Sequence, residues 1–149
     1  MRDEAGIGVV KHLRLTYDGA LMIIKAAVAK AAAMVVPQCI AVVDDGGNLL
    51  AFVRIDGSKF LSVDPSIRKA KTAVSGRRRR ANVQAEVAIK LAIATSGRYI
   101  NLKRGLPIVL DREVIGAIGV DSGTGDQDVE VATAGIAAIA GAVGTLGLL

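Results

Sequence analysis

The segments CIAVVDDGGNLLAFVRIDG (39–57) and GLPIVLDREVIGAIGVDSGTGDQD (105–128) decide the fold of this chain. In each, a run rich in Val, Ile and Leu leads into the residue types of a tight turn and then into a second such run. Strands joined by turns this short must pair antiparallel. The two segments therefore predict two β-hairpins in one antiparallel sheet.

Helical patterns precede, separate and follow the hairpins. Asp64 and Pro65 are typical of an N-cap followed by the first helical position, where the missing N–H of proline costs nothing. Apolar spacing and turn residues predict helices over about 17–34, 64–76, 82–94 and 126–140. An added strand over 6–15 would bring the sheet to about five strands. The order predicts an α+β domain in which helices flank the sheet.

The length of 149 residues fits a single domain, 1–149, with a core over about 15–140, an N-terminal arm at 1–14 and a C-terminal tail at 141–149. Hydrophobic residues make up 52% of the chain but aromatic residues only 3%, so Ala, Val, Ile and Leu must build the core. Ala-rich faces are also typical of subunit contacts. We therefore expect a homo-oligomer.

Cysteine usage and the chain termini bear on the compartment. Cys39 is the single cysteine, so no disulfide can form within the chain and a reducing compartment is expected. The N-terminus lacks the apolar run of a signal peptide. The uncharged stretch 131–149 has about the length of a membrane span, but it is rich in Ala and Gly and follows acidic residues as a capped helix does. We expect a cytoplasmic protein without a membrane partner.

Positive charge is concentrated in one part of the chain. Eleven of the 19 Lys and Arg residues, but only one of the 14 acids, fall between Arg68 and Arg104. The block Arg77–Arg80 has three open interpretations: pairing with acids of a neighbouring subunit, an anionic ligand, or nucleic acid. Nucleic acid is not expected, because the aromatic residues that stack on bases are absent around the block.

The order of several short motifs resembles the GlcG/HbpS family (DUF336, the haem-degrading type of domain also found at the C-terminal end of PduO-type proteins). These motifs are LTYDGA, IAVVDDGGNLLAFVRIDG, IRKAKTA, GLPI, VIGAIGV and QD, spread over roughly 15–140. The resemblance implies a profilin-like α/β/α fold and homo-oligomers. It also implies several activities: haem binding or degradation with redox sensing, roles beside glycolate or propanediol utilisation, and cofactor-free lyase or mutase chemistry on a hydroxylaminobenzoate.

Two candidate ligand contacts lie at strand ends. Arg54 and Asp56 are two residues apart, so we expect both side chains on one face, where Arg54 can hold a carboxylate and Asp56 can orient it or transfer a proton. The alternative is an ion pair that fixes the following loop. Gly119 allows a helix or a ligand to approach its strand closely, helix packing being the first interpretation. Gly119 and Gly105 are also candidate ligand contacts.

The loop at 121–128 is interpreted as a pocket rim that caps the last helix, whose N-terminal amides can receive an anion. It lacks both the lysine of a phosphate-binding loop and the spacing of a calcium loop. Asp121 is a candidate for proton transfer, and Ser122, Gln127 and Asp128 are candidate ligand contacts.

Tyr99 and His12 are the remaining candidates. Tyr99 lies between Arg98 and Lys103, and neighbouring positive charge favours acid/base work by a phenol, with Arg98 as an anion contact. His12 is the only histidine, which argues against a multi-histidine metal site, so no metal is predicted. One histidine suffices as an axial haem ligand, although a structural or solvated role is the simpler interpretation.

Together these residues favour a protein that binds a small, anionic molecule. The first hypothesis is a cofactor-free lyase or isomerase acting on a small, perhaps aromatic carboxylate such as a hydroxylaminobenzoate. The alternative is a haem-binding, haem-degrading or redox-sensing accessory protein with haem as cofactor. A second alternative is an interaction module that uses Arg77–Arg80. The sequence leaves open whether the protein is an enzyme.

Overall fold

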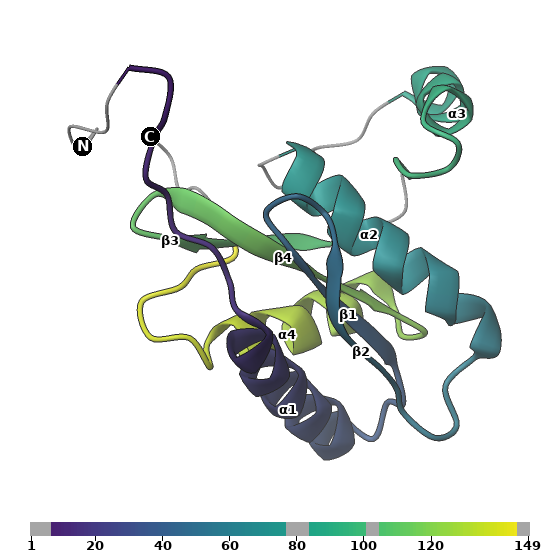
Figure 1. The fold of residues 1–149 in the computed structure, drawn as a ribbon. Helices are drawn as coiled ribbons and strands as arrows, with labels where there is room; N and C mark the ends of the chain where they lie inside the picture. Colours follow the sequence, from purple (N-terminus) through teal and green to yellow (C-terminus); the bar gives the residue numbers. More distant parts are fainter. Residues whose placement is uncertain (1–6, 77–83, 101–104, 146–149) are drawn as a thin grey trace.

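The computed structural model describes residues 7–76, 84–100 and 105–145. In chain order its elements are α1 (Tyr17–Met34), β1 (Cys39–Asp44), β2 (Leu49–Arg54), the 3-10 turn η1 (Phe60–Ser62), α2 (Val63–Gly76), α3 (Ala85–Ala94), β3 (Leu106–Leu110), β4 (Glu113–Asp121) and α4 (Gly125–Ile136) (Figure 1). Both predicted hairpins and the α+β class are confirmed.

The sheet has four strands in the order β2-β1-β4-β3, and every neighbouring pair is antiparallel. Cys39, at the start of β1, pairs with Arg54 on β2 and with Asp121 on β4. Paired residues of antiparallel strands project to the same face. The register therefore brings these three side chains to one face at one end of the sheet.

The count of about five strands was too high for the described residues. Residues 7–15 form an extended arm, and one of its few anchors is the N–H of Leu15, which donates to the carbonyl oxygen of Ile115 at 3.0 Å. A single backbone hydrogen bond does not make a strand ladder. The arm nevertheless contributes to the core, because Leu15 is buried.

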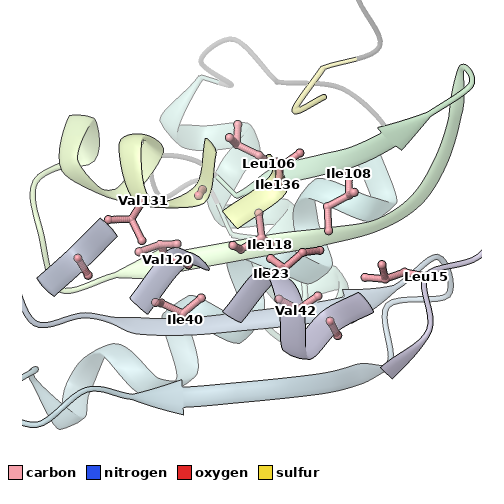
Figure 2. Packing of buried hydrophobic residues seen from close by; sticks show 14 of the residues in the cluster. Leu15, Ile23, Ile40, Val42, Leu106, Ile108, Ile118, Val120, Val131 and Ile136 are labelled. Atoms are coloured by element: carbon pink, nitrogen blue, oxygen red, sulfur yellow. The ribbon is translucent and has the colours of Figure 1, made fainter. Parts of the chain in front are cut away.

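The core lies between the sheet and the helices α1 and α4, which cover one face, while α2 covers the other (Figure 1). On the α1 and α4 side, large aliphatic side chains interdigitate, as Figure 2 shows for Ile23 of α1, Ile40 of β1, Ile118 of β4 and Val131 of α4. All four are fully buried. The near absence of aromatic residues is thus matched by a core of Ile, Leu, Val and Ala.

Helix α2 lies unusually close to the sheet because two glycines leave room for its backbone. A Cβ added at Gly119 would lie 1.9 Å from the carbonyl oxygen of Ser66, and one at Gly105 would lie 2.2 Å from that of Lys69. Neither distance is possible for a real side chain. The two glycines therefore pack against α2, which is the first interpretation of Gly119, and the close approach brings Lys69 to the end of β4.

Two predicted boundaries need correction. The turn η1 runs directly into α2, so α2 begins at Val63 and Asp64 lies in its first turn rather than at the N-cap. Helix α4 ends at Ile136, after which Val143 pairs with Val109 of β3, so the tail packs on the sheet as far as this pair. Within the described ranges, no helix has the length and apolar character needed to cross a membrane.

Candidate functional site

A buried lysine organises one end of the sheet. Lys69 projects from α2 with a side chain that is only 3% exposed. Its Nζ donates to the carbonyl oxygen of Val120 at 2.8 Å, to Asp121 Oδ1 at 2.5 Å and to Asp128 Oδ2 at 3.1 Å. An ammonium has three N–H donors, so its hydrogen-bonding capacity is fully used. Burying such a cation is costly unless it is paired and hydrogen-bonded as it is here.

Asp128 completes this arrangement, which we call the Lys69 corner (Gln38, Lys69, Asp121, Gly123 and Asp128). Its Oδ1 accepts from Gln38 Nε2 at 2.8 Å and from the backbone N–H of Gly123 at 3.1 Å. Burial raises the pKa of Asp128, while Lys69 opposes the rise. Gln38 Oε1 is buried without a hydrogen-bond partner among the described residues. The corner ties β1, β4, α2 and α4 together.

The loop that leads into α4 caps this helix, as predicted. Thr124 Oγ1 accepts from the N–H of Gln127, and the side chain of Gln127 accepts from the N–H of Thr124, so the two form a capping box. Ser122 has a positive φ of 98°, and its Oγ accepts from the N–H of Lys59 at 3.0 Å. Gln127 thus caps the helix from within the loop, whereas Ser122 joins the loop to Lys59.

The predicted pair at the end of β2 is not joined. Arg54 ends the strand, so the two-residue alternation does not carry on to Asp56, and no ion pair links these two described residues. Both are exposed. Beside Arg54, Cys39 is buried with its Sγ 3.6 Å from Ser58 Oγ, and burial raises the pKa of its thiol.

The structure places Tyr99 and Arg98 elsewhere, in a cavity of about 710 Å³ between the β1–β2 turn, α2 and the segment after α3. The described residues that line it are Asp45, Gly46, Gly47, Asn48, Lys71, Val74, Ser75, Ala94, Thr95, Ser96, Arg98 and Tyr99. Strand β1 separates this cavity from the Lys69 corner, and its six residues span about 17 Å. Tyr99 and Asp121 are therefore not parts of one site.

The segment that carries Tyr99 is fastened to α2. Thr72 Oγ1 donates to the carbonyl oxygen of Arg98 at 3.3 Å and accepts from the N–H of Ile100 at 3.1 Å. The Arg68 guanidinium donates to the carbonyl oxygen of Gly97. These bonds on both sides of Tyr99 hold its backbone at the wall of the cavity.

His12 lies at the edge of this region, in the N-terminal arm. Its Nε2 is 2.7 Å from Oδ2 of Asp45, a residue that lines the cavity, and its side chain is 52% exposed. His12 itself does not line the cavity in the described structure. The block Arg77–Arg80 lies outside the described residues.

Sequence reasoning counted Lys69 and Lys71 only as part of the basic stretch, and it selected neither them nor Gln38 as site residues. A signal for Lys69 was present, because Ser66, Lys69 and Ala73 are three and four residues apart and share the buried face of α2. A lysine on a buried helix face requires acidic partners. For Gln38 and Lys71 the sequence holds no comparable signal.

The sequence of this chain is similar to those of known proteins. The family model described as "Haem degrading protein HbpS-like" matches residues 15–137. A 15.0 kDa protein encoded between dhaT and dhaS in Citrobacter freundii is 35% identical over 119 residues, which are 76% of this chain and 84% of the relative.

Two solved structures have similar folds. HbpS from Streptomyces reticuli, solved as a double mutant, is 32% identical with a TM-score of 0.73, and the match covers 92% of this chain and 94% of HbpS. The complex of PduOC with haem is 26% identical with a TM-score of 0.76, and the match covers 89% of this chain and 99% of PduOC. The ligand named in this second structure is haem.

Proposed function

This chain belongs to the HbpS-like family, and we propose that it binds haem in the cavity between α2 and residues 94–99. The observation that carries the proposal is the composition of this cavity. Its volume of about 710 Å³ lies within the range of small-molecule sites. Most of its lining residues are polar: it combines the aliphatic side chains of Val74 and Ala94 with two cations, the carboxylate of Asp45 and a phenol. A protein of the same fold is solved with haem bound.

The residues of the cavity fit the chemical groups of haem. Val74 and Ala94 supply apolar contact for a porphyrin face. Lys71 and Arg98 can pair with its two carboxylates, Arg98 through the planar fork of its guanidinium. Bound haem would supply redox and oxygen chemistry through its iron.

The comparisons favour this function over the cofactor-free lyase that the sequence favoured first. That hypothesis offered Tyr99, Asp56 or Asp121 for proton transfer, and of these Tyr99 and Asp121 lie at opposite ends of β1. Asp121 is moreover engaged by Lys69. Haem binding, in contrast, needs only apolar contacts and cations, and Val74, Ala94, Lys71 and Arg98 of the cavity can provide them.

A titration of the purified chain with ferric haem tests the proposal. We expect a saturable change of the Soret band with one haem per chain. Lys71→Gln and Arg98→Gln should each weaken binding about fivefold, the effect of a partly solvated ion pair worth about 1 kcal/mol. Haem dimethyl ester, which lacks both carboxylates, should bind the wild type less tightly and should not distinguish the variants.

Lys90→Gln is the matched control. Lys90 is an exposed lysine of α3 that pairs with Glu86 and does not line the cavity. Its loss should leave haem affinity unchanged. If the wild type shows no saturable Soret change, or if Lys90→Gln weakens binding as much as Lys71→Gln, the chain does not bind haem in this cavity.

The proposal includes a homo-oligomer. Helix α3 exposes Val87, Ile89 and Ile93, and Ile93 is 75% exposed. Ile89 and Ile93 are four residues apart and so share one face of this short helix, which supports a contact between subunits. Sedimentation equilibrium of the wild type and of Ile93→Lys tests this, with a shift toward monomer expected for the variant.

A further inference from the structure

We infer that Tyr99, rather than His12, is the residue of this chain that binds the haem iron. The inference rests on the proposed function and names the side chain that would hold the haem iron. Protein ligands of haem iron are His, Cys, Met and Tyr. Among the described residues that line the cavity, Tyr99 is the only one of these four types.

None of the other described candidates is among the residues that line the cavity. His12 is 52% exposed in the arm, and its Nε2 is held by Asp45. Cys39 is fully buried at the far end of β1. Tyr17 belongs to α1, which covers the face of the sheet opposite α2 (Figure 1). Met22 and Met34 also belong to α1.

The surroundings of Tyr99 suit an iron ligand. The N–H of Tyr99 donates to Thr95 Oγ1 at 3.0 Å, and the hydrogen bonds of Thr72 fix the residues on either side. A ligand held by its backbone requires little ordering when the metal binds. An anionic oxygen donor favours ferric over ferrous iron.

Optical and resonance Raman spectra of the haem complex provide the direct test. The wild type should show a phenolate-to-iron charge-transfer band and an iron–phenolate vibration, and it should bind ferric haem more tightly than ferrous haem. Tyr99→Phe should abolish both spectral features and weaken ferric haem binding by about tenfold or more. His12→Ala and Tyr17→Phe should leave spectrum and affinity unchanged.

Tyr99→His separates iron binding from a structural role. Phe resembles Tyr more closely in shape, yet only His retains a group that binds iron. We therefore expect Tyr99→His to keep haem with an imidazole-type spectrum, while Tyr99→Phe loses affinity. If haem binds and Tyr99→Phe keeps the wild-type spectrum, or if only His12→Ala removes it, the inference is wrong while haem binding stands. Absence of saturable binding to the wild type would instead refute the proposed function.

Discussion

Replacing Lys69 with Met removes the cation of the Lys69 corner while nearly keeping the length of the side chain. Removing one partner of a buried ion pair costs about 3–5 kcal/mol, because the remaining charge stays buried without compensation. Asp128 is 3% exposed and would bear this cost almost fully, whereas Asp121 is 23% exposed and can regain water. We therefore expect Lys69→Met to lower the free energy of unfolding by about 4 kcal/mol. For a domain of this size, the melting temperature should fall by about 8–16 °C.

The pH dependence separates this electrostatic cause from lost packing. Burial raises the pKa of Asp128 above its usual 3.8, and Lys69 opposes the rise, so Lys69→Met should raise this pKa further. A carboxyl whose pKa is higher in the folded state than in the unfolded state lowers the free energy of unfolding as pH rises. The loss begins near the pKa of the unfolded state and is complete above the pKa of the folded state. The deficit of Lys69→Met should therefore be largest at neutral pH and should shrink near about pH 4.

Urea denaturation followed by circular dichroism at both pH values measures the deficit. Lys90→Met is the control, since Lys90 pairs with Glu86 at 2.8 Å but is 71% exposed, and its loss should cost below about 0.5 kcal/mol. A deficit for Lys69→Met under about 1 kcal/mol, or one of equal size at both pH values, would refute the reasoning.

Gly119→Ala places a Cβ 1.9 Å from the carbonyl oxygen of Ser66, so α2 has to move away from β4 and thermal unfolding should show a loss of about 1–3 kcal/mol. Wild-type stability in this variant would contradict the close packing. Thr124→Ala removes the acceptor for the N–H of Gln127 and should cost about 1 kcal/mol, seen as a lower urea midpoint at unchanged slope. An unchanged midpoint would mean that the capping box adds no stability. The Cys39 thiol is buried and its pKa is raised by burial above 9.0, so near about pH 8 a thiol reagent should react with it only as fast as the fold opens. Immediate reaction without denaturant would show the thiol to be accessible.

The sequence predicted correctly those helices and hairpins that are determined by local patterns of apolar and turn residues. Helix α1 spans Tyr17–Met34, as the apolar spacing predicted, and both hairpins lie where short turns separate aliphatic runs. The predicted start of α2 was wrong. It was taken from Asp64 and Pro65 alone, whereas the turn η1 continues directly into the helix at Val63. A strand over 6–15 was wrong because a strand needs a partner along its length, and this requirement has no local signature.

The candidate site was less accessible, because tertiary contacts assemble it. Asp121 and Asp128 were selected from the loop composition, but their partner Lys69 is more than fifty residues away in the sequence. Tyr99 was selected for the positive charge of Arg98 and Lys103 beside it, and Asp121 for its place in the loop before the last helix. Only the register of β1 with β4 shows that the two lie at opposite ends of the sheet.

Helix α2 connects the Lys69 corner with the cavity. Lys69 and Lys71 are two residues apart and so project from different sides of the helix, one into the corner and the other into the cavity wall. Thr72, on the next turn, holds the segment that carries Tyr99. Because Lys69 fixes α2 against β4 and α4, the position of that cavity wall depends on a buried ion pair at the other end of β1. The corner therefore fixes the helix from which Lys71 and Thr72 reach the cavity and its wall segment, while its own charged groups pair with one another.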